Sequence, residues 1–283
     1  MAKLINVLKQ CEPMASHCSL RAGGVAQDFF MPASIQALVE FLNKNTKPIL
    51  LVGLGSNLLV RDSGFKGVVI KLTQLKSLQL KHNRIMAEAG VTLAKLSRFT
   101  HEKNLSGAEF LSAIPGTVGG ALAMNAGAFG SEFWEFVKCI HTVNTAGEVF
   151  ERQSADFNIG YRHVKPVHPH EYFIAAELEF NQTPSSQNIQ QLLQKRNASQ
   201  PIGLPSCGSV FKNPEQYYAA ELIENSQLKG FCIGGACVSD KHANYIINHN
   251  NASATDIENL ILHIQQTVKS NFKIDLETEL KII

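Results

Sequence analysis

Two residues in one short turn have side chains that could carry out chemistry. The segment PSCGSVFKNP, residues 205–214, places Cys207 and Ser209 two positions apart, on either side of a glycine. Cys207 would be a nucleophile only if its thiolate were stabilised, and no partner for it is evident in the sequence. The Ser209 hydroxyl is a weak acid, so it could donate a proton only in a dry site beside a cation. Which of them acts depends on the ligand that the rest of the chain binds.

Other polar residues could bind an anion or a metal. Arg196 lies on the apolar side of a predicted helix, where a diphosphate or carboxylate partner would explain its charge. His163, His168 and His170 stand close together, but the stretch HVKPVHPH offers no regular scaffold and no fourth ligand. We therefore expect no metal site.

Two glycine-rich segments indicate a bound anion or nucleotide. GLGSNLL, residues 53–59, carries half of a Rossmann fingerprint but lacks its third glycine and the later acidic residue, which argues against a Rossmann site. IPGTVGGALAMNAGAFG, residues 114–130, either forms a tightly packed helix of small residues or exposes the N–H groups of Gly119 and Gly120 to a pyrophosphate. A P-loop is absent from the sequence. The residues by themselves indicate a nucleotide-like cofactor and no more.

The composition narrows the class of protein. The chain has 283 residues, 45% hydrophobic and 18% charged, with a net charge of +2. These values are typical of a globular protein and give no reason to expect nucleic-acid binding. Neither a signal peptide nor an apolar run of membrane-spanning length is present, so we expect no membrane insertion and a cytoplasmic location. The six cysteines form no CxxC pair, and we expect reduced, mostly structural thiols.

The elements that must position these residues alternate along the chain. Apolar periodicity and capping residues predict helices at 34–44 (with Ser34 as N-cap), 92–104, 187–197 and 216–226, and a last helix that starts at a Thr255/Glu258 capping box. Short apolar runs predict strands at 48–52, 67–72, 84–91, 172–180 and 275–283, and a hairpin at 140–152. The polar stretch 181–187 is the best linker. The chain is therefore predicted to be α+β, with a boundary near residue 183.

Eight segments in chain order resemble one family, the UDP-N-acetylenolpyruvoylglucosamine reductases (UDP-N-acetylmuramate dehydrogenases). They are HCSLRAGGVAQDFF, GLGSNLLV, IPGTVGGALAMNAGAFG, FNIGYRHV, KRNASQP, PSCGSVFKNP, the run 222–257 and LETEL. Cys18, Leu20 and Val164 depart from the residues common in the family. The short length resembles the subtype that lacks an extra tyrosine loop.

The resemblance implies a fold and a reaction. The fold would be an FAD-binding domain of the vanillyl-alcohol-oxidase (PCMH) type, with subdomains at 1–70 and 71–183, followed by an α+β substrate-binding domain at 184–283. FAD would bind non-covalently, NADPH would supply the hydride, and the enolpyruvyl ether of a UDP-sugar would become the D-lactyl ether of UDP-N-acetylmuramate. We expect a monomer whose partner is this substrate.

The resemblance also assigns residues to roles. Arg162 would stabilise the substrate carboxylate and the developing enolate, Ser209 would donate the proton, and Glu279 would pair with Arg162 or assist proton delivery. On an extended segment Glu277 would share the face of Glu279, so spacing does not separate the two. Cys207 would be a small, packed residue. The predicted cofactor-binding residues are Gly53, Leu54, Gly55, Ser56, Asn57, Leu58, Ser112, Ile114, Pro115, Gly116, Gly119, Gly120, Ala121, Asn125, Ala126 and Gly127. The predicted substrate-binding residues are Tyr161, Arg196, Gln200, Lys212 and Asn213, with His242 and Asn244 shaping the pocket.

Two other functions are compatible with such a fold. One is a flavin enzyme that oxidises another small molecule with oxygen. The other is a nucleotide- or flavin-binding module without catalytic activity. Retention of the Arg162, Ser209 and Glu279 pattern argues against the second.

Overall fold

The chain divides into two compact units that are not continuous in sequence. The computed structural model describes residues 5–184 and 188–283. Unit 1 comprises Met1–Lys9, Asp28–Leu54 and Gly67–Gln194, and unit 2 comprises Gln10–Gln27, Gly55–Lys66 and Lys195–Ile283. The predicted boundaries at residues 70 and 183 cut the chain into consecutive stretches and stay a prediction.

The strands are short and pair into several small sheets. Their bounds are β1 Val7–Pro13, β2 Val25–Met31, β3 Ile49–Val52, β4 Leu58–Leu59, β5 Phe65–Lys71, β6 Leu78–Lys81, β7 Arg84–Glu88, β8 Gly127–Ala128, β9 Ser131–Glu132, β10 Val137–Asn144, β11 Val149–Arg152, β12 Phe157–Gly160, β13 His163–Pro166, β14 Glu171–Glu179, β15 Cys232–Ile233, β16 Ala236–Val238, β17 Ile246–Asn248 and β18 Lys281–Ile282. One sheet has the order β1-β2-β5-β3.

Six α-helices accompany these strands in the described part of the chain. Their bounds are α1 Ile35–Leu42, α2 Leu93–Glu102, α3 Val118–Met124, α4 Ile189–Ser199, α5 Ala219–Asn225 and α6 Ala254–Phe272. The mixed helix and strand content confirms the predicted α+β class. Residue 187, where the fourth helix was predicted to start, and residues 185–187 of the predicted linker lie outside the described residues. Within the described residues, no helix combines the length and the apolar character that crossing a membrane requires.

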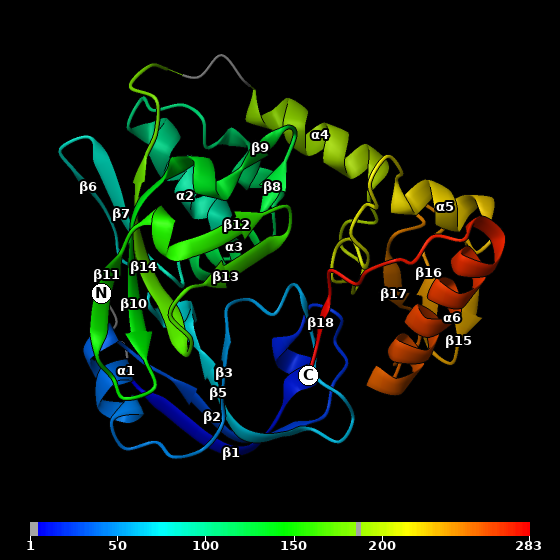
Figure 1. Ribbon diagram of the computed structural model, residues 1–283, viewed down its shortest axis with the longest axis horizontal. Coiled ribbons are helices and arrows are strands. Elements are labelled where there is room, and N and C mark those ends of the chain that lie inside the picture. Colours follow the sequence, from blue (N-terminus) through cyan, green and yellow to red (C-terminus); the bar gives the residue numbers. More distant parts are fainter. Residues whose placement is uncertain (1–4, 185–187) are drawn as a thin grey trace. The chain divides into compact units, whose positions relative to one another are not determined.

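Unit 1 is built around an antiparallel sheet of five strands in the order β11-β10-β14-β7-β6. Helices α2 and α3 contribute to the core that covers it, with Leu93, Leu96 and Leu122 among the buried residues (Figure 1). The Thr92 hydroxyl accepts a hydrogen bond from the Lys95 backbone N–H and so fixes the start of α2. The hairpin of β10 and β11 turns at Asn144–Gly147, as predicted, because the Asn144 side chain accepts two backbone N–H groups of that turn.

Unit 2 packs around α6, whose apolar residues recur every three or four positions. Ile257, Leu260, Ile261, Ile264 and Val268 are buried in one core. Strands β15, β16 and β17 form an antiparallel sheet, and both β15 and β16 contact α6 (Figure 1). The chain end is tied in by β18, which pairs in parallel with β4 and aligns Lys281 with Leu58.

One pair of cysteines differs from the sequence prediction. Cys232 and Cys237 stand opposite each other on β15 and β16 and form a disulfide. The prediction of reduced thiols is wrong for this pair, because the tight turn between the strands brings the two Cα atoms to 4.1 Å. Of the other four cysteines, Cys18, Cys139 and Cys207 are buried and Cys11 is exposed.

The start of α6 also differs from the prediction. The N-cap is Ser253, and its capping box is closed by Asp256, not by Thr255 and Glu258. Thr255 is instead held from outside the helix: the Asp62 carboxylate accepts the Thr255 hydroxyl and the backbone N–H groups of Ala254 and Thr255. Burial acts to raise the pKa of Asp62, but these hydrogen bonds outweigh it, so the pKa lies below its usual value.

We expect Asp62→Ala to lower the free energy of unfolding by about 1 kcal/mol at pH 7, because three donors at the start of α6 lose their acceptor while the side chain is open to solvent. Since folding lowers the pKa of Asp62, this stabilisation is present above the usual carboxyl pKa and is lost as the pH falls through the folded-state value. Urea unfolding at pH 7 and pH 3 measures both effects.

The matched control is Asp275→Ala, whose carboxylate pairs with Lys269 but is 75% exposed. It should change the unfolding free energy by less than about 0.5 kcal/mol. Equal losses in the two variants would contradict the role given to Asp62.

Candidate active site

Ser209 lies in a turn of unit 2 whose backbone is fixed by one asparagine. Gly208 before it has φ +80°, a conformation that glycine adopts without strain. The Asn244 side chain accepts the Phe211 N–H and donates to the Phe211 carbonyl, and the Asn244 carbonyl accepts the Val210 N–H. These three hydrogen bonds hold the segment directly after Ser209. The turn is therefore built to keep one hydroxyl in place.

One buried phenol, that of Tyr245, interacts with the Ser209 side chain. Burial raises the pKa of the Tyr245 hydroxyl to about 12, and the charge of Glu279 acts in the same direction, whereas the Arg196 charge and the Ser209 side chain oppose it. Cys207 is buried, and burial raises the pKa of its thiol to about 12. A thiolate is therefore disfavoured, and the prediction that Cys207 is a packed residue is confirmed.

The structure separates the two glutamates that spacing could not. Glu277 is 73% exposed and forms an ion pair with Lys212 at 2.6 Å. Glu279 is partly buried, and its charge acts on both Cys207 and Tyr245. Its backbone is fixed on both sides, because its N–H donates to Val210 and its carbonyl accepts the Asn57 side chain. Of the two glutamates, Glu279 is therefore the one whose charge acts on the buried side chains of Cys207 and Tyr245.

The predicted substrate-binding residues of unit 2 are already engaged with one another or with the backbone. The Arg196 Nε donates to the Gln200 side chain at 3.0 Å, and burial lowers the pKa of the Arg196 guanidinium. The Lys212 ammonium pairs with Glu277. The Asn213 side chain accepts the Ala219 N–H at the start of α5. Arg196 and Gln200 therefore form a pair across one turn at the end of α4, and their binding of one ligand stays a prediction.

Arg162 occupies the two-residue turn between β12 and β13, in unit 1. It has φ +51°, a left-handed conformation that Tyr161, the other residue of the turn, does not share. Its guanidinium donates to the carbonyl of Asn125 at 3.2 Å and to that of Gly127 at 2.7 Å, and it lies 5.2 Å from the Tyr161 ring. The guanidinium is thus oriented by the glycine-rich segment. Val164, a departure from the family pattern, packs against the core.

Asn125 joins this turn to the end of α3. It is 1% exposed and ends the helix in a left-handed conformation, with φ 42°. Its side chain donates to Glu132 and to the Gly160 carbonyl and accepts the Trp134 N–H. Asn125, Gly127, Tyr161 and Arg162 therefore lie close together, and their membership of one binding site stays a prediction.

The start of α3 contradicts one prediction. The N–H groups of Gly119 and Gly120 are not exposed to a ligand: Gly119 donates to the Ala89 carbonyl at 2.9 Å and Gly120 to the Thr117 hydroxyl at 3.4 Å. A Cβ at Gly119 would lie 3.0 Å from that of Ala89. The packed-helix interpretation therefore holds at this end. Nearby, Ser112 and Ile114 also bond locally, to Glu109 and Leu111.

The loop 53–58 crosses from unit 1 to unit 2 and is fixed by close packing. A Cβ at Gly53 would meet the Thr117 hydroxyl, and one at Gly55, where φ is +69°, would meet the His17 carbonyl. Asn57 donates to the Glu279 carbonyl, but its Oδ1 is buried and has no hydrogen-bond partner within the described residues. A buried acceptor of this kind needs a donor, which an ordered water or a ligand with N–H or O–H groups would supply.

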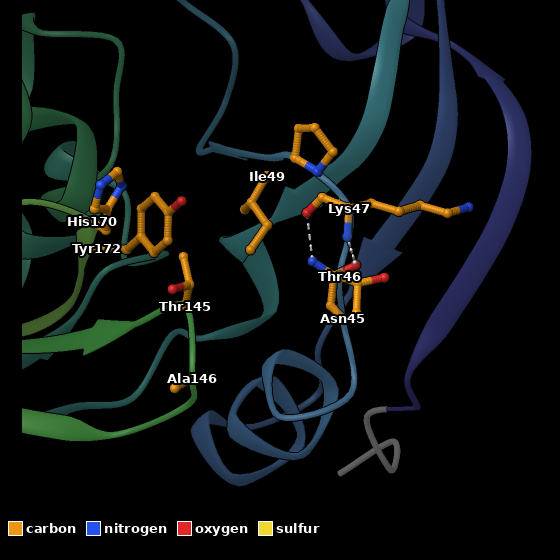
Figure 2. A pocket seen from close by; sticks show the side chains of 9 residues that line it. Asn45, Thr46, Lys47, Ile49, Thr145, Ala146, His170 and Tyr172 are labelled. Carbon is orange, nitrogen blue, oxygen red and sulfur yellow. Dashed lines mark hydrogen bonds between the residues drawn. The ribbon is translucent and has the colours of Figure 1, made fainter.

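The predicted site residues fall into two groups, one in each unit. Arg162 and the segment 114–130 belong to unit 1, whereas Ser209, Glu279 and Arg196 belong to unit 2. Figure 2 shows a hollow in unit 1 that includes His170 and Tyr172, where none of the predicted site residues lies. Among the described residues, no group of three or more His, Cys, Asp or Glu side chains could hold a metal ion.

Tyr245 is the residue of the site that sequence reasoning missed. It stands in the apolar run ANYIIN, where an aromatic residue is most simply explained as part of the core. Its position directly after Asn244 is the signal that could have found it, because Asn244 was itself assigned to the pocket.

Comparisons with known proteins match both parts of the chain. A family model described as "UDP-N-acetylenolpyruvoylglucosamine reductase, C-terminal domain" matches residues 200–283, and one described as "FAD binding domain" matches residues 31–152. The UDP-N-acetylenolpyruvoylglucosamine reductase of Methylococcus capsulatus is 46% identical, with 96% of this chain and 91% of the relative covered. That of Nitrosomonas eutropha is 46% identical over 98% and 88%.

A solved structure also matches the fold over nearly the whole chain. The crystal structure of UDP-N-acetylenolpyruvylglucosamine reductase from Thermus caldophilus superimposes with a TM-score of 0.83 at 26% identity, and 98% of each chain is covered. The chain thus contains an FAD-binding domain, and its cofactor is FAD. The buried Asn57 Oδ1 fits this cofactor, since ribityl hydroxyls and the flavin N–H are donors of the kind that it needs.

Proposed function

Because the chain belongs to the family of the UDP-N-acetylenolpyruvoylglucosamine reductases, we propose that it reduces the enolpyruvyl ether of a UDP-sugar to UDP-N-acetylmuramate. The product is a precursor of peptidoglycan. The proposal includes NADPH as the hydride donor, a cytoplasmic location and a monomeric enzyme. The chain is an FAD-containing oxidoreductase, and the proposal concerns its substrate and its residues.

The observation that carries the proposal is the surroundings of Ser209. Reduction of this alkene needs a hydride at one carbon and a proton at the other. FAD, when bound, supplies the hydride transfer. The proton must come from a group that is neutral and acidic enough to protonate a carbanion. Ser209 has the required hydroxyl, with the Arg196 cation and the Tyr245 phenol beside it.

The remaining residues act on charge and position. Arg162 stabilises the substrate carboxylate and the enolate-like charge that forms next to it, and a guanidinium held by two carbonyls is preorganised for this. Glu279 holds the proton-donating group in orientation. Tyr161, Arg196, Gln200, Lys212 and Asn213 bind the substrate.

The proposal is tested first by the visible spectrum of the purified protein. We expect a yellow protein that NADPH bleaches without oxygen and that the enolpyruvyl substrate recolours. A colourless protein, or one that the substrate does not recolour, would refute the proposed activity. Recolouring by oxygen alone, with peroxide formed and no effect of substrate, would favour the oxidase alternative.

Ser209→Ala should slow the substrate-dependent oxidation of the NADPH-reduced enzyme by about 100-fold or more, because the alkene loses its proton source. Reduction by NADPH should stay normal. The matched control is Cys207→Ala, which removes a buried thiol two residues away and should keep most of the activity. Stopped-flow absorbance measures both half-reactions. Comparable losses in the two variants would contradict the assignment of Ser209.

Glu279→Gln and Glu277→Gln should have different kinetic effects. Glu279→Gln should lower kcat by about 100-fold with little change in KM, because in the proposed mechanism its carboxylate orients the proton-donating group. Glu277→Gln should leave kcat within about threefold and raise KM, because it loosens only the Lys212 ammonium. Steady-state kinetics with varied substrate separate the two. A kcat loss of equal size in Glu277→Gln would show that the roles had been assigned to the wrong glutamate.

A further inference from the structure

Tyr245 is a buried tyrosine to which the reaction described above gives no task. It is 6% exposed, and its hydroxyl lies close enough to the Ser209 side chain for an interaction with that side chain to lower its pKa. The Arg196 guanidinium acts electrostatically on the same hydroxyl. All three residues belong to unit 2. A serine hydroxyl, a phenol and a guanidinium therefore belong to the same compact unit.

The two hydroxyls are held together by one backbone clamp. Ser209 directly precedes Val210, and Tyr245 directly follows Asn244. Val210 and Asn244 are joined through a hydrogen bond of 2.9 Å, and the Asn244 side chain adds two more to Phe211. Ser209 adjoins Val210 and Tyr245 adjoins Asn244, so the hydrogen bond between Val210 and Asn244 couples the positions of the two segments.

The phenol ring itself is fixed from the other side. The Tyr245 N–H donates to the His242 carbonyl, and its carbonyl accepts the Ser239 N–H. The ring packs against the edge of the His242 imidazole, with 4.8 Å between the centroids and 65° between the planes. These contacts with the turn therefore fix the position of the ring and of its hydroxyl.

The environment keeps the phenol protonated. Burial raises the pKa of Tyr245 to about 12, and the Cys207 and Glu279 side chains act in the same direction, while Arg196 and the Ser209 side chain oppose them. Tyr245 is therefore a neutral donor over the whole range in which an enzyme works.

A neutral phenol at this place answers the main difficulty of a serine proton donor. When the Ser209 O–H bond breaks and its proton forms the new C–H bond, the electron pair stays on the serine oxygen. That oxygen becomes negative in a dry site, which is costly unless a donor faces it. The Tyr245 O–H can face it without moving, and the Arg196 cation stabilises the pair further. Solvent then returns a proton to Ser209.

We propose that Tyr245 is a positioning residue for proton delivery: its hydroxyl orients Ser209 and hydrogen-bonds the serine oxygen as the proton leaves. The inference rests on the proposed function, because it presupposes that Ser209 is the proton donor.

The test is Tyr245→Phe, which keeps the ring and removes only the hydroxyl. We expect the substrate-dependent oxidation of the NADPH-reduced enzyme to slow by about 10- to 100-fold, the loss typical of one hydrogen bond to a developing charge. FAD content, the melting temperature, the rate of reduction by NADPH and the Kd of the substrate should stay unchanged. The solvent deuterium isotope effect on the slowed step should rise, since proton transfer becomes rate-limiting.

The matched control is Tyr217→Phe, a tyrosine of the same unit that is 52% exposed. It should leave both half-reactions within about twofold of wild type. The double variant Ser209→Ala/Tyr245→Phe should be no slower than Ser209→Ala alone, because Tyr245 acts through Ser209. In protein labelled with 3-fluorotyrosine, the ¹⁹F resonance that Tyr245→Phe removes should shift in Ser209→Ala, and this measurement needs no turnover.

The outcomes separate the inference from the function. If Ser209→Ala is slow and Tyr245→Phe is as fast as wild type, or if the two losses add in the double variant, the role of Tyr245 is refuted and the function stands. An unmoved ¹⁹F resonance also refutes it. If Ser209→Ala is as fast as wild type, or if no substrate-dependent oxidation exists, the proposed function itself fails.

Discussion

Irregular backbone can be buried only when its N–H and C=O groups have partners, and in this protein buried asparagine side chains supply many of them. Asn125 does so at the end of α3, Asn244 beside the Ser209 turn, and Asn248 between the Leu20 carbonyl and the Ala252 N–H. An amide suits this task because, like a peptide group of a neighbouring strand, it has both a donor and an acceptor. Arg162 and Ser209 lie outside the strands and helices, and the amides of Asn125 and Asn244 hold the backbone next to them.

The same constraint explains what the sequence could predict and what it could not. Signals that act within one turn of chain were interpreted correctly: Ser34 and Thr92 cap their helices, and Asn144 closes its hairpin. At the start of α6 two capping boxes compete within a few residues. The choice of Ser253 over Thr255 is made by Asp62, which lies almost two hundred residues earlier and leaves no local trace.

The expectation of exposed N–H groups at Gly119 and Gly120 was wrong for a related reason. A pattern of small residues before a helix is compatible with anion binding and with close packing, and the decision belongs to the neighbouring strand. Here the Ala89 carbonyl takes the Gly119 N–H, so the pattern serves packing at that point. Tyr245 was missed for the opposite reason, because its sequence context indicates packing and not ligand binding. Its ring satisfies the expectation of a core residue, and its hydroxyl gains a function only through Ser209, 36 positions away in the sequence.

The electrostatics of unit 2 also decide between the two side chains of the opening turn. Burial raises the pKa values of Cys207 and of Tyr245 alike to about 12, so the surroundings favour neutral O–H and S–H groups over anions. Such a site opposes nucleophilic attack by Cys207, which would need a thiolate. It favours the opposite chemistry, in which a neutral donor protonates a carbon that has become basic. The burial that makes the cysteine inert also keeps the Tyr245 phenol neutral, and in the proposed reaction this phenol and the Arg196 guanidinium support the Ser209 hydroxyl as an acid.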